Sequence, residues 1–498
     1  MSTKPFPRQP SLAHFKHQAK DLLKARQSGR DDALFSIHQH HPRLSKLTES
    51  ELREAPFLLS DAQLVVAREY GFASWEKLRA RAEAVLSFAC NPHEVAASAS
   101  DLGDEFLRLV CLTYGADHPS RREKARQLFG EHPELRGSGV PVAAAMGDAT
   151  TLADLLQKQP ELARKAGGPY RWEPLLYLAY SRFDGTEPWS NPVEAARLLL
   201  RHGADPNAGY LWDGNYVFTA LTGVFGEGEA GPVNQPRHRD EEALARLLLD
   251  AGADPNDSQT LYNRMFTPGT SHLRLLLDCG LGQPHKSPWP DRMGGRLQTP
   301  AEMLREQLRW AAQHGHADRA ALLLAHGVDP NCQNRNNQTP YELAVLNGNL
   351  AIAEILLAHG ATRKSLTPLE EFEAACNRAD VEVAKSLLES QPKLLSELGD
   401  RRVDLLLAAA SNNRLAAAHL LLDLGFDVNG MKSRSALHEA AWAGHLEMVK
   451  LLIERGADPS IRDASHQATP LDWARYSQRL SVAEFLESFG SQALERPA

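Results

Sequence analysis

Three histidines lie close together near the start of the chain and could contribute to a metal site. They form the run HQHHP at positions 38, 40 and 41. Protein zinc sites combine histidine with Cys, Asp, Glu or further His ligands at fixed spacing. No Cys, Asp or Glu stands at ligand spacing beside this run, so the sequence predicts a solvated helix end.

A second group of titratable side chains falls in or beside two loops rich in Pro and Gly, 181–192 and 226–240. Its members are Asp184, Glu187, His238, Asp240 and Glu241. If these side chains converged, the two loops would form a lobe that binds a small molecule or a metal ion, and such a lobe could be catalytic. Acidic residues in loops of this kind are usually solvated, so this is the alternative hypothesis.

The common catalytic signatures are absent from the sequence. There is no G-x-S-x-G, no H-E-x-x-H, no P-loop and no G-x-G-x-x-G between a strand and a helix. The glycine-rich run 223–231 lies between two predicted helices and does not suit a dinucleotide. We therefore expect a protein that is not an enzyme and holds no cofactor.

Composition and charge restrict the class of partner. The 498 residues include 55 Lys and Arg against 63 Asp and Glu, which gives a net charge of −8. The sequence contains no block of basic residues that could bind along a phosphate backbone. Residues 1–10 lack an apolar export core, and no apolar run is long enough to span a membrane. Five scattered cysteines suit a reducing compartment. These features predict a cytoplasmic, monomeric protein that binds neither nucleic acid nor membrane.

One element recurs along the chain and predicts how it is built. The string LLL-x-x-G-A-D-P-N occurs at 198–207 and 247–256, with looser copies at 322–331, 420–429 and 451–460. The clearest complete unit, 435–460, predicts one helix over 436–443 and another over 446–455, with a stop at Gly456 and Pro459. So small a unit cannot bury its own apolar face, so copies must stack on one another.

The glycines of this element lie at 203, 252, 280, 327, 360, 425, 456 and 490. Several of their intervals are close to 33 residues. The openings of the units read SALH at 435–438, TPYE at 339–342 and TPLD at 469–472. In spacing, helix opening and turn together, the sequence resembles the ankyrin-repeat family. The resemblance implies an all-α solenoid of stacked helix-turn-helix units with short turn fingers. It also implies a concave face that binds another protein, and a structural role for His438 in bonding backbone between repeats.

The N-terminal part differs from the array. Residues 61–81, DAQLVVAREYGFASWEKLRAR, resemble a helical leader found ahead of bacterial ankyrin arrays, with Ser74 as a helix cap. From Asp104 onward we expect eleven helix pairs. The predicted domains are a disordered N-terminus (1–10), a helical cap module (11–90), degenerate repeats with inserted loops (100–281), a Pro/Gly-rich insertion or bend (282–298), further repeats (299–490) and a disordered tail (491–498).

The expected function is a non-enzymatic scaffold that binds a partner protein of unknown identity. Aligning the repeats on Gly444 places Trp442 on the exposed side of an inner helix, with Tyr180, Leu346 and Tyr476 at equivalent positions. Aromatic residues on a preformed surface are frequent binding hot spots. For Tyr180 the alternative, burial beneath the inserted loop, carries equal weight.

The turns between repeats add further candidate contact residues. In one of these turns, Asn337 stands at a position that favours positive φ. They are Arg335, Asn336, Arg434, Trp212 and Tyr216. Trp212 and Tyr216 fit either a ligand-facing loop or a long turn that tucks its aromatic rings into the neighbouring turn.

Overall fold

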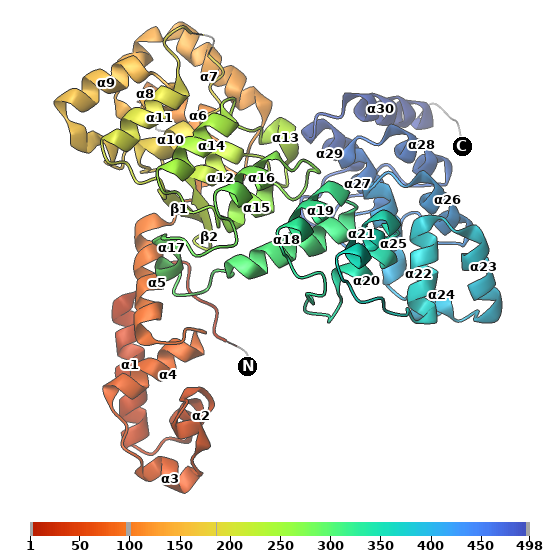
Figure 1. The fold of residues 1–498 in the computed structure, drawn as a ribbon, viewed down its shortest axis with the longest axis horizontal. Coiled ribbons are helices and arrows are strands. Elements are labelled where there is room, and N and C mark those ends of the chain that lie inside the picture. Colours follow the sequence, from red (N-terminus) through yellow and green to blue (C-terminus); the bar gives the residue numbers. More distant parts are fainter. Residues whose placement is uncertain (1–2, 96–100, 186, 495–498) are drawn as a thin grey trace. The chain divides into compact units, whose positions relative to one another are not determined.

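The computed structural model describes residues 3–95, 101–185 and 187–494, and the regular secondary structure of these residues is almost entirely helical (Figure 1). The expected all-α solenoid is confirmed, with one short hairpin added. The chain divides into two compact units. Unit 1 comprises Met1–Gly226, Arg237–Thr260 and Cys279–Thr299, and unit 2 comprises Glu227–Pro236, Leu261–Asp278 and Pro300–Ala498.

Unit 1 begins with a module of five helices. They are α1 (Leu12–Gln27), α2 (Asp31–His40), α3 (Glu49–Glu54), α4 (Leu59–Glu69) and α5 (Trp75–Phe88), with 3-10 turns at Leu44–Lys46 and Pro92–Glu94. Ser74 caps α5 as expected, because its hydroxyl accepts a hydrogen bond from the Lys77 N–H at 3.3 Å. Phe15, Tyr70 and Phe72 fill the core of the module.

The last histidine of the HQHHP run is not exposed to solvent. His41 is buried, and its Nε2 lies 3.1 Å from the Asp61 carboxylate at the start of α4. The prediction of a solvated helix end is therefore wrong at His41, since its partner stands 20 residues away in the sequence.

The rest of unit 1 stacks four helix pairs, α6/α7, α8/α9, α10/α11 and α12/α14. Their bounds are α6 (Leu102–Val110), α7 (Pro119–Glu131), α8 (Val140–Met146), α9 (Ala149–Lys158), α10 (Pro174–Tyr180), α11 (Pro192–Arg201), α12 (Ala220–Phe225) and α14 (Glu241–Asp250), with 3-10 turns at Pro133–Gly137 and Pro160–Ala163. One turn is lengthened into an antiparallel hairpin, β1 (Gly209–Trp212) and β2 (Tyr216–Thr219), in which Trp212 pairs with Tyr216.

The Pro/Gly-rich segment 282–298 contains the short helix α17 (Trp289–Arg292), which packs against α5. Trp289 is buried with Val85 and Leu211, and its indole N–H donates to the Asn207 carbonyl at 2.9 Å. This segment is thus an integral part of unit 1. The predicted domain boundaries stay a prediction, and residues 1–2 and 495–498 of the predicted disordered ends lie outside the described residues.

Unit 2 stacks the other seven pairs, α15/α16, α18/α19, α20/α21, α22/α23, α25/α26, α27/α28 and α29/α30, which completes the eleven pairs expected from Asp104. The bounds are α13 (Gly231–Asn234), α15 (Ser258–Asn263), α16 (Ser271–Asp278), α18 (Pro300–His314), α19 (Ala317–Ala325), α20 (Pro340–Leu346), α21 (Leu350–Ala358), α22 (Pro368–Arg378), α23 (Val381–Ser390), α24 (Leu394–Glu397), α25 (Arg401–Ser411), α26 (Leu415–Asp423), α27 (Ala436–Ala443), α28 (Leu446–Glu454), α29 (Pro470–Tyr476) and α30 (Leu480–Leu494). The first three residues of α15 belong to unit 1. Helix α30 continues through position 490, the last glycine of the recurring element.

The helix openings follow from local chemistry. Thr339 and Thr469 are N-caps whose hydroxyls accept the N–H groups of Glu342 and Asp472, and each carboxylate bonds back to its threonine. Both helices then start with proline, whose missing N–H costs nothing in the first turn. The motif T-P-x-D/E therefore encodes a helix start without help from distant residues.

Where the repeat motif ends in asparagine, this residue joins its unit to the next. The Asn331 amide donates to the Gly360 carbonyl at 3.0 Å and accepts the Thr362 N–H at 2.8 Å. Asn429 makes the same pair of bonds to Gly456 and Asp458, at 3.1 and 2.8 Å. Only a side chain with both a donor and an acceptor can satisfy both groups.

Leu452 is buried in the core of unit 2, as the stacking register requires. We expect Leu452→Ala to lower the free energy of unfolding by about 2–5 kcal/mol, because it leaves a cavity between helix pairs. Urea unfolding followed by circular dichroism measures the change. Glu447→Ala, on the solvent side of the same helix, is the control and should change stability by only about 0.5 kcal/mol. An equally small effect for Leu452→Ala would contradict the register.

His438 makes stability dependent on pH. Its ring lies 2.9 Å from the Ser435 hydroxyl and 3.1 Å from the Ala468 carbonyl, and burial lowers its pKa below the ordinary 6.5. The unfolded chain therefore binds more protons below about pH 6.5, and the stability that His438 contributes is lost as the pH falls through its folded pKa. The melting temperature should fall less between pH 7.5 and 5 in His438→Gln than in the wild type. His38→Gln, at an exposed position, should keep the wild-type slope.

Candidate functional site

The candidate contact positions on the inner helices of unit 2 lie in one repeated setting. Four of the inner helices, α18, α20, α25 and α27, end near a carbonyl that is bonded by a side chain of the next pair. The Asn349 amide donates to the Gln313 carbonyl at 3.0 Å, and Asn377 donates to Leu346 at 2.8 Å. The row fixes the ends of the inner helices and so positions their outward side chains.

The same pattern continues in the later repeats. The His445 ring lies 3.1 Å from the Ser411 carbonyl, and the Arg479 Nε donates to the Trp442 carbonyl at 3.0 Å. Trp442 is therefore held at its backbone by the following repeat, while its ring is half-buried. The alignment of the repeats places the inner-helix contact positions in one row. It does not show that their backbone carbonyls accept hydrogen bonds from the following repeat.

Trp442 and Tyr476 form a stacked pair on consecutive inner helices, α27 and α29. Their ring centroids lie 5.9 Å apart with an interplanar angle of 21°. Trp473 meets the edge of Trp442 at 5.6 Å and 73°. The Tyr476 residue is 40% exposed, so the pair is open to solvent on one side. It presents an aromatic surface of the kind that a partner side chain can bury.

Trp473, which contacts the Trp442 ring, is itself held in place by a hydrogen bond. Its indole N–H donates to the Asp463 carboxylate at 3.1 Å. Asp463 is buried, which opposes its ionisation, but hydrogen bonds from His466, Trp473, Ala468 and Ser465 bring its pKa to about 2. A permanent carboxylate therefore anchors the ring on which Trp442 rests.

The candidates in the turns of unit 2 are exposed. Arg335 and Asn336 lie on the finger before α20, where Asn337 has the expected positive φ of 59°. The Arg434 guanidinium forms an ion pair with Glu439. Leu346 is half-buried on α20. These four residues stay predicted contacts.

Tyr180 is fully buried and cannot contact a partner. Its hydroxyl donates to the Thr219 carbonyl at 2.9 Å, and its ring packs against Trp172 and Tyr210. Of the two alternatives for this residue, burial holds, and Tyr180 is removed from the site.

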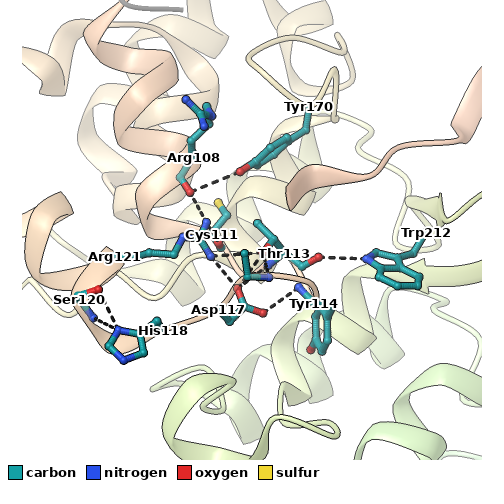
Figure 2. A network of polar contacts seen from close by, with 11 residues as sticks. Arg108, Cys111, Thr113, Tyr114, Asp117, His118, Ser120, Arg121, Tyr170 and Trp212 are labelled. Carbon is teal, nitrogen blue, oxygen red and sulfur yellow. Dashed lines mark hydrogen bonds and ion pairs between the residues drawn. The ribbon is translucent and has the colours of Figure 1, made fainter. Parts of the chain in front are cut away.

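Trp212 is tucked into unit 1 rather than presented to a ligand. Its indole N–H donates to the Thr113 carbonyl at 3.1 Å, as Figure 2 shows. Its neighbour in the hairpin, Tyr216, is 54% exposed and remains open to solvent. Of the two interpretations of this turn, internal packing fits Trp212, and only Tyr216 keeps a contact role.

The network in Figure 2 explains why the Thr113 carbonyl is held in place. The buried Asp117 carboxylate accepts the N–H groups of Thr113 and Tyr114, both at 2.8 Å, and the Arg121 guanidinium at 2.7 Å. Burial raises the pKa of the nearby Cys111 thiol to about 12, so it is not a nucleophile at neutral pH. The network locks the loop between α6 and α7.

In the described part of the two inserted loops, the candidate side chains do not converge on a metal site. Asp184 is paired with Arg126 at 2.6 Å. His238 is buried, and burial, with Arg182 and Arg239 nearby, holds its pKa well below the usual value. Within residues 3–95, 101–185 and 187–494, no three His, Cys, Asp or Glu side chains gather to hold a metal ion. Contact between the loops does occur, since Arg239 donates to the Gly185 carbonyl at 2.6 Å and to Ser190 at 2.7 Å.

A hollow of about 720 Å³ lies in unit 2, along the turns that join the helices of three successive pairs. Its lining includes Gly348, Asn349, Asn377, Arg378 and Asp380. Asn349 and Asn377 also belong to the row of carbonyl bonds, so the hollow runs beside the inner-helix ends. Sequence reasoning did not predict it, because no motif marks it.

Among the described residues, no helix combines the length and apolar character needed to cross a lipid bilayer.

Comparison with known proteins identifies the repeats. A family of ankyrin repeats (3 copies) matches residues 372–463 and 405–493, and a second family of ankyrin repeats (many copies) matches residues 308–357. The putative ankyrin repeat protein YahD of Escherichia coli is 28% identical over 196 residues, covering 36% of this chain and 94% of that protein.

Two further relatives are larger proteins. The ankyrin repeat and KH domain-containing protein mask-1 of Caenorhabditis elegans is 27% identical over 208 residues, covering 40% of this chain and 8% of that protein. The palmitoyltransferase AKR1 of Lachancea kluyveri is 36% identical over 101 residues, covering 19% of this chain and 14% of that protein. The chain therefore spans only a small part of these two relatives.

Proposed function

We propose that this chain, whose repeats match ankyrin repeats, is a non-enzymatic scaffold that binds a partner protein through the concave face of unit 2. The observation that supports this most is the stacked pair of Trp442 and Tyr476 on consecutive inner helices. Trp442 packs against Trp473 and stacks on Tyr476 before a partner arrives, which reduces the conformational entropy lost on binding.

Charge and chemistry fit a protein partner better than other classes. The net charge of −8 disfavours a nucleic acid backbone. We propose a cytoplasmic protein that acts as a monomer, and we place its remaining contacts at Leu346, Arg335, Asn336 and Arg434. Tyr216 of unit 1 is a separate candidate contact.

Replacing Trp442 and Tyr476 together by Ala should weaken partner binding without unfolding the array. Loss of two hot-spot rings costs about 2 kcal/mol or more, which is roughly 30-fold in affinity. Affinity purification of the full chain identifies the partner, and isothermal titration calorimetry with that purified partner measures the change.

Phe35→Ala is the matched control for this double variant. Phe35 is an exposed aromatic residue on α2, outside the proposed face, so its removal should leave the affinity unchanged. Equal affinities for the wild type and the double variant, with folding intact by circular dichroism, would remove Trp442 and Tyr476 from the site.

A further inference from the structure

The loop Glu227–Pro236 belongs to unit 2, although the residues on both sides of it belong to unit 1. It is closed by its own hydrogen bonds. The Glu227 N–H donates to the Gln235 carbonyl at 2.5 Å, and the Ala230 N–H donates to the Gln235 side chain at 3.1 Å. These hydrogen bonds within the loop stabilise its conformation.

One end of the loop is anchored to the first helix pair of unit 2. The Glu227 carboxylate lies 3.4 Å from the Arg264 Nε and accepts the Thr267 hydroxyl at 2.7 Å. Both charged side chains are almost fully buried. Glu227 has a φ of 56°, a conformation that a non-glycine residue adopts only when its surroundings enforce it. The Tyr262 hydroxyl donates to Glu229 beside this anchor.

The other end of the loop is anchored to the last helix pair. The Asn234 amide donates to the Tyr476 carbonyl at 3.1 Å and to the Ala230 carbonyl of its own loop at 3.1 Å. Asn234 is fully buried. Tyr476 is the final residue of α29, the inner helix of that pair.

This second anchor repeats the bond seen between successive pairs. The carbonyls of Leu346, Ser411 and Trp442 each receive a side chain from the next pair along the chain. Tyr476 occupies the equivalent position, and α30 is the last helix in the described part of the chain. Asn234 therefore stands where a further repeat would place its donor.

We propose that the loop Glu227–Pro236 is a tethered cap that takes the place of a following repeat on α29 and staples the last helix pair of unit 2 to the first. A solenoid exposes unsatisfied groups at its ends, and terminal elements must cover them. Here the cover comes from residues about 240 positions earlier in the sequence. The Tyr476 side chain remains 40% exposed, so the cap holds the backbone of this residue and leaves its ring accessible.

Hydrogen–deuterium exchange of the full chain tests the cap. Asn234→Ala removes the donor to Tyr476, and Asn234→Asp keeps the size of the side chain but offers a carboxylate that cannot donate. Both variants should exchange about fivefold faster in α29 and in the first turns of α30, because a lost hydrogen bond lowers the free energy of local opening. Glu227→Gln, which weakens the first anchor, should raise exchange in α29 as well.

Asn412→Ala is the matched control. Asn412 lies in the same array, and its amide donates only within its own helix pair, to the Ala408 carbonyl at 2.8 Å. It should leave exchange in α29 unchanged. If both Asn234 variants exchanged in α29 at the wild-type rate, or if Glu227→Gln affected only residues 261–268, the staple would be overturned. Because partner binding is not measured, this result is independent of the proposed function.

Discussion

Hydrogen bonds from side chains to the backbone of the neighbouring repeat hold the array in register. Apolar packing between helix pairs is strong but tolerates small shifts, whereas an amide that both donates and accepts fixes two backbone groups at once. Asn331 and Asn429 do this on the turn side. Asn377, His445 and Arg479 bond the carbonyls at the ends of the inner helices. These bonds hold the repeats that make them at the turn or at the end of the inner helix, and they make the outward positions more rigid.

The proposed site uses this rigidity. Trp442 and Tyr476 stack because their helices are held one repeat apart, and Trp473 is itself anchored by the Asp463 carboxylate. The aromatic rings offer apolar contact area, while in unit 1 burial raises the pKa of the Cys111 thiol and lowers the pKa of His238. The matches to ankyrin repeats lie in unit 2, which also carries the aromatic pair.

The sequence predicted what depends on neighbouring residues. Thr339 and Thr469 cap helices by accepting the backbone N–H three positions later, and Gly444 takes a left-handed conformation at a helix end, so these features follow from short motifs. It could not predict contacts between distant residues. Tyr180 is bonded to Thr219 and His41 to Asp61, and both were misplaced or left open because no local pattern marks their partners. The split of the loop 226–240 between two units was missed for the same reason.

The bond between Asn234 and Tyr476 also has a temporal meaning. The two residues are separated by 242 positions, and a ribosome adds about 5–20 residues per second, so roughly 12 to 50 s pass between their syntheses. During that interval the Asn234 amide has no Tyr476 carbonyl to bond. Unit 2 can therefore complete this contact only after α29 has been synthesised, long after the loop Glu227–Pro236 has left the ribosome.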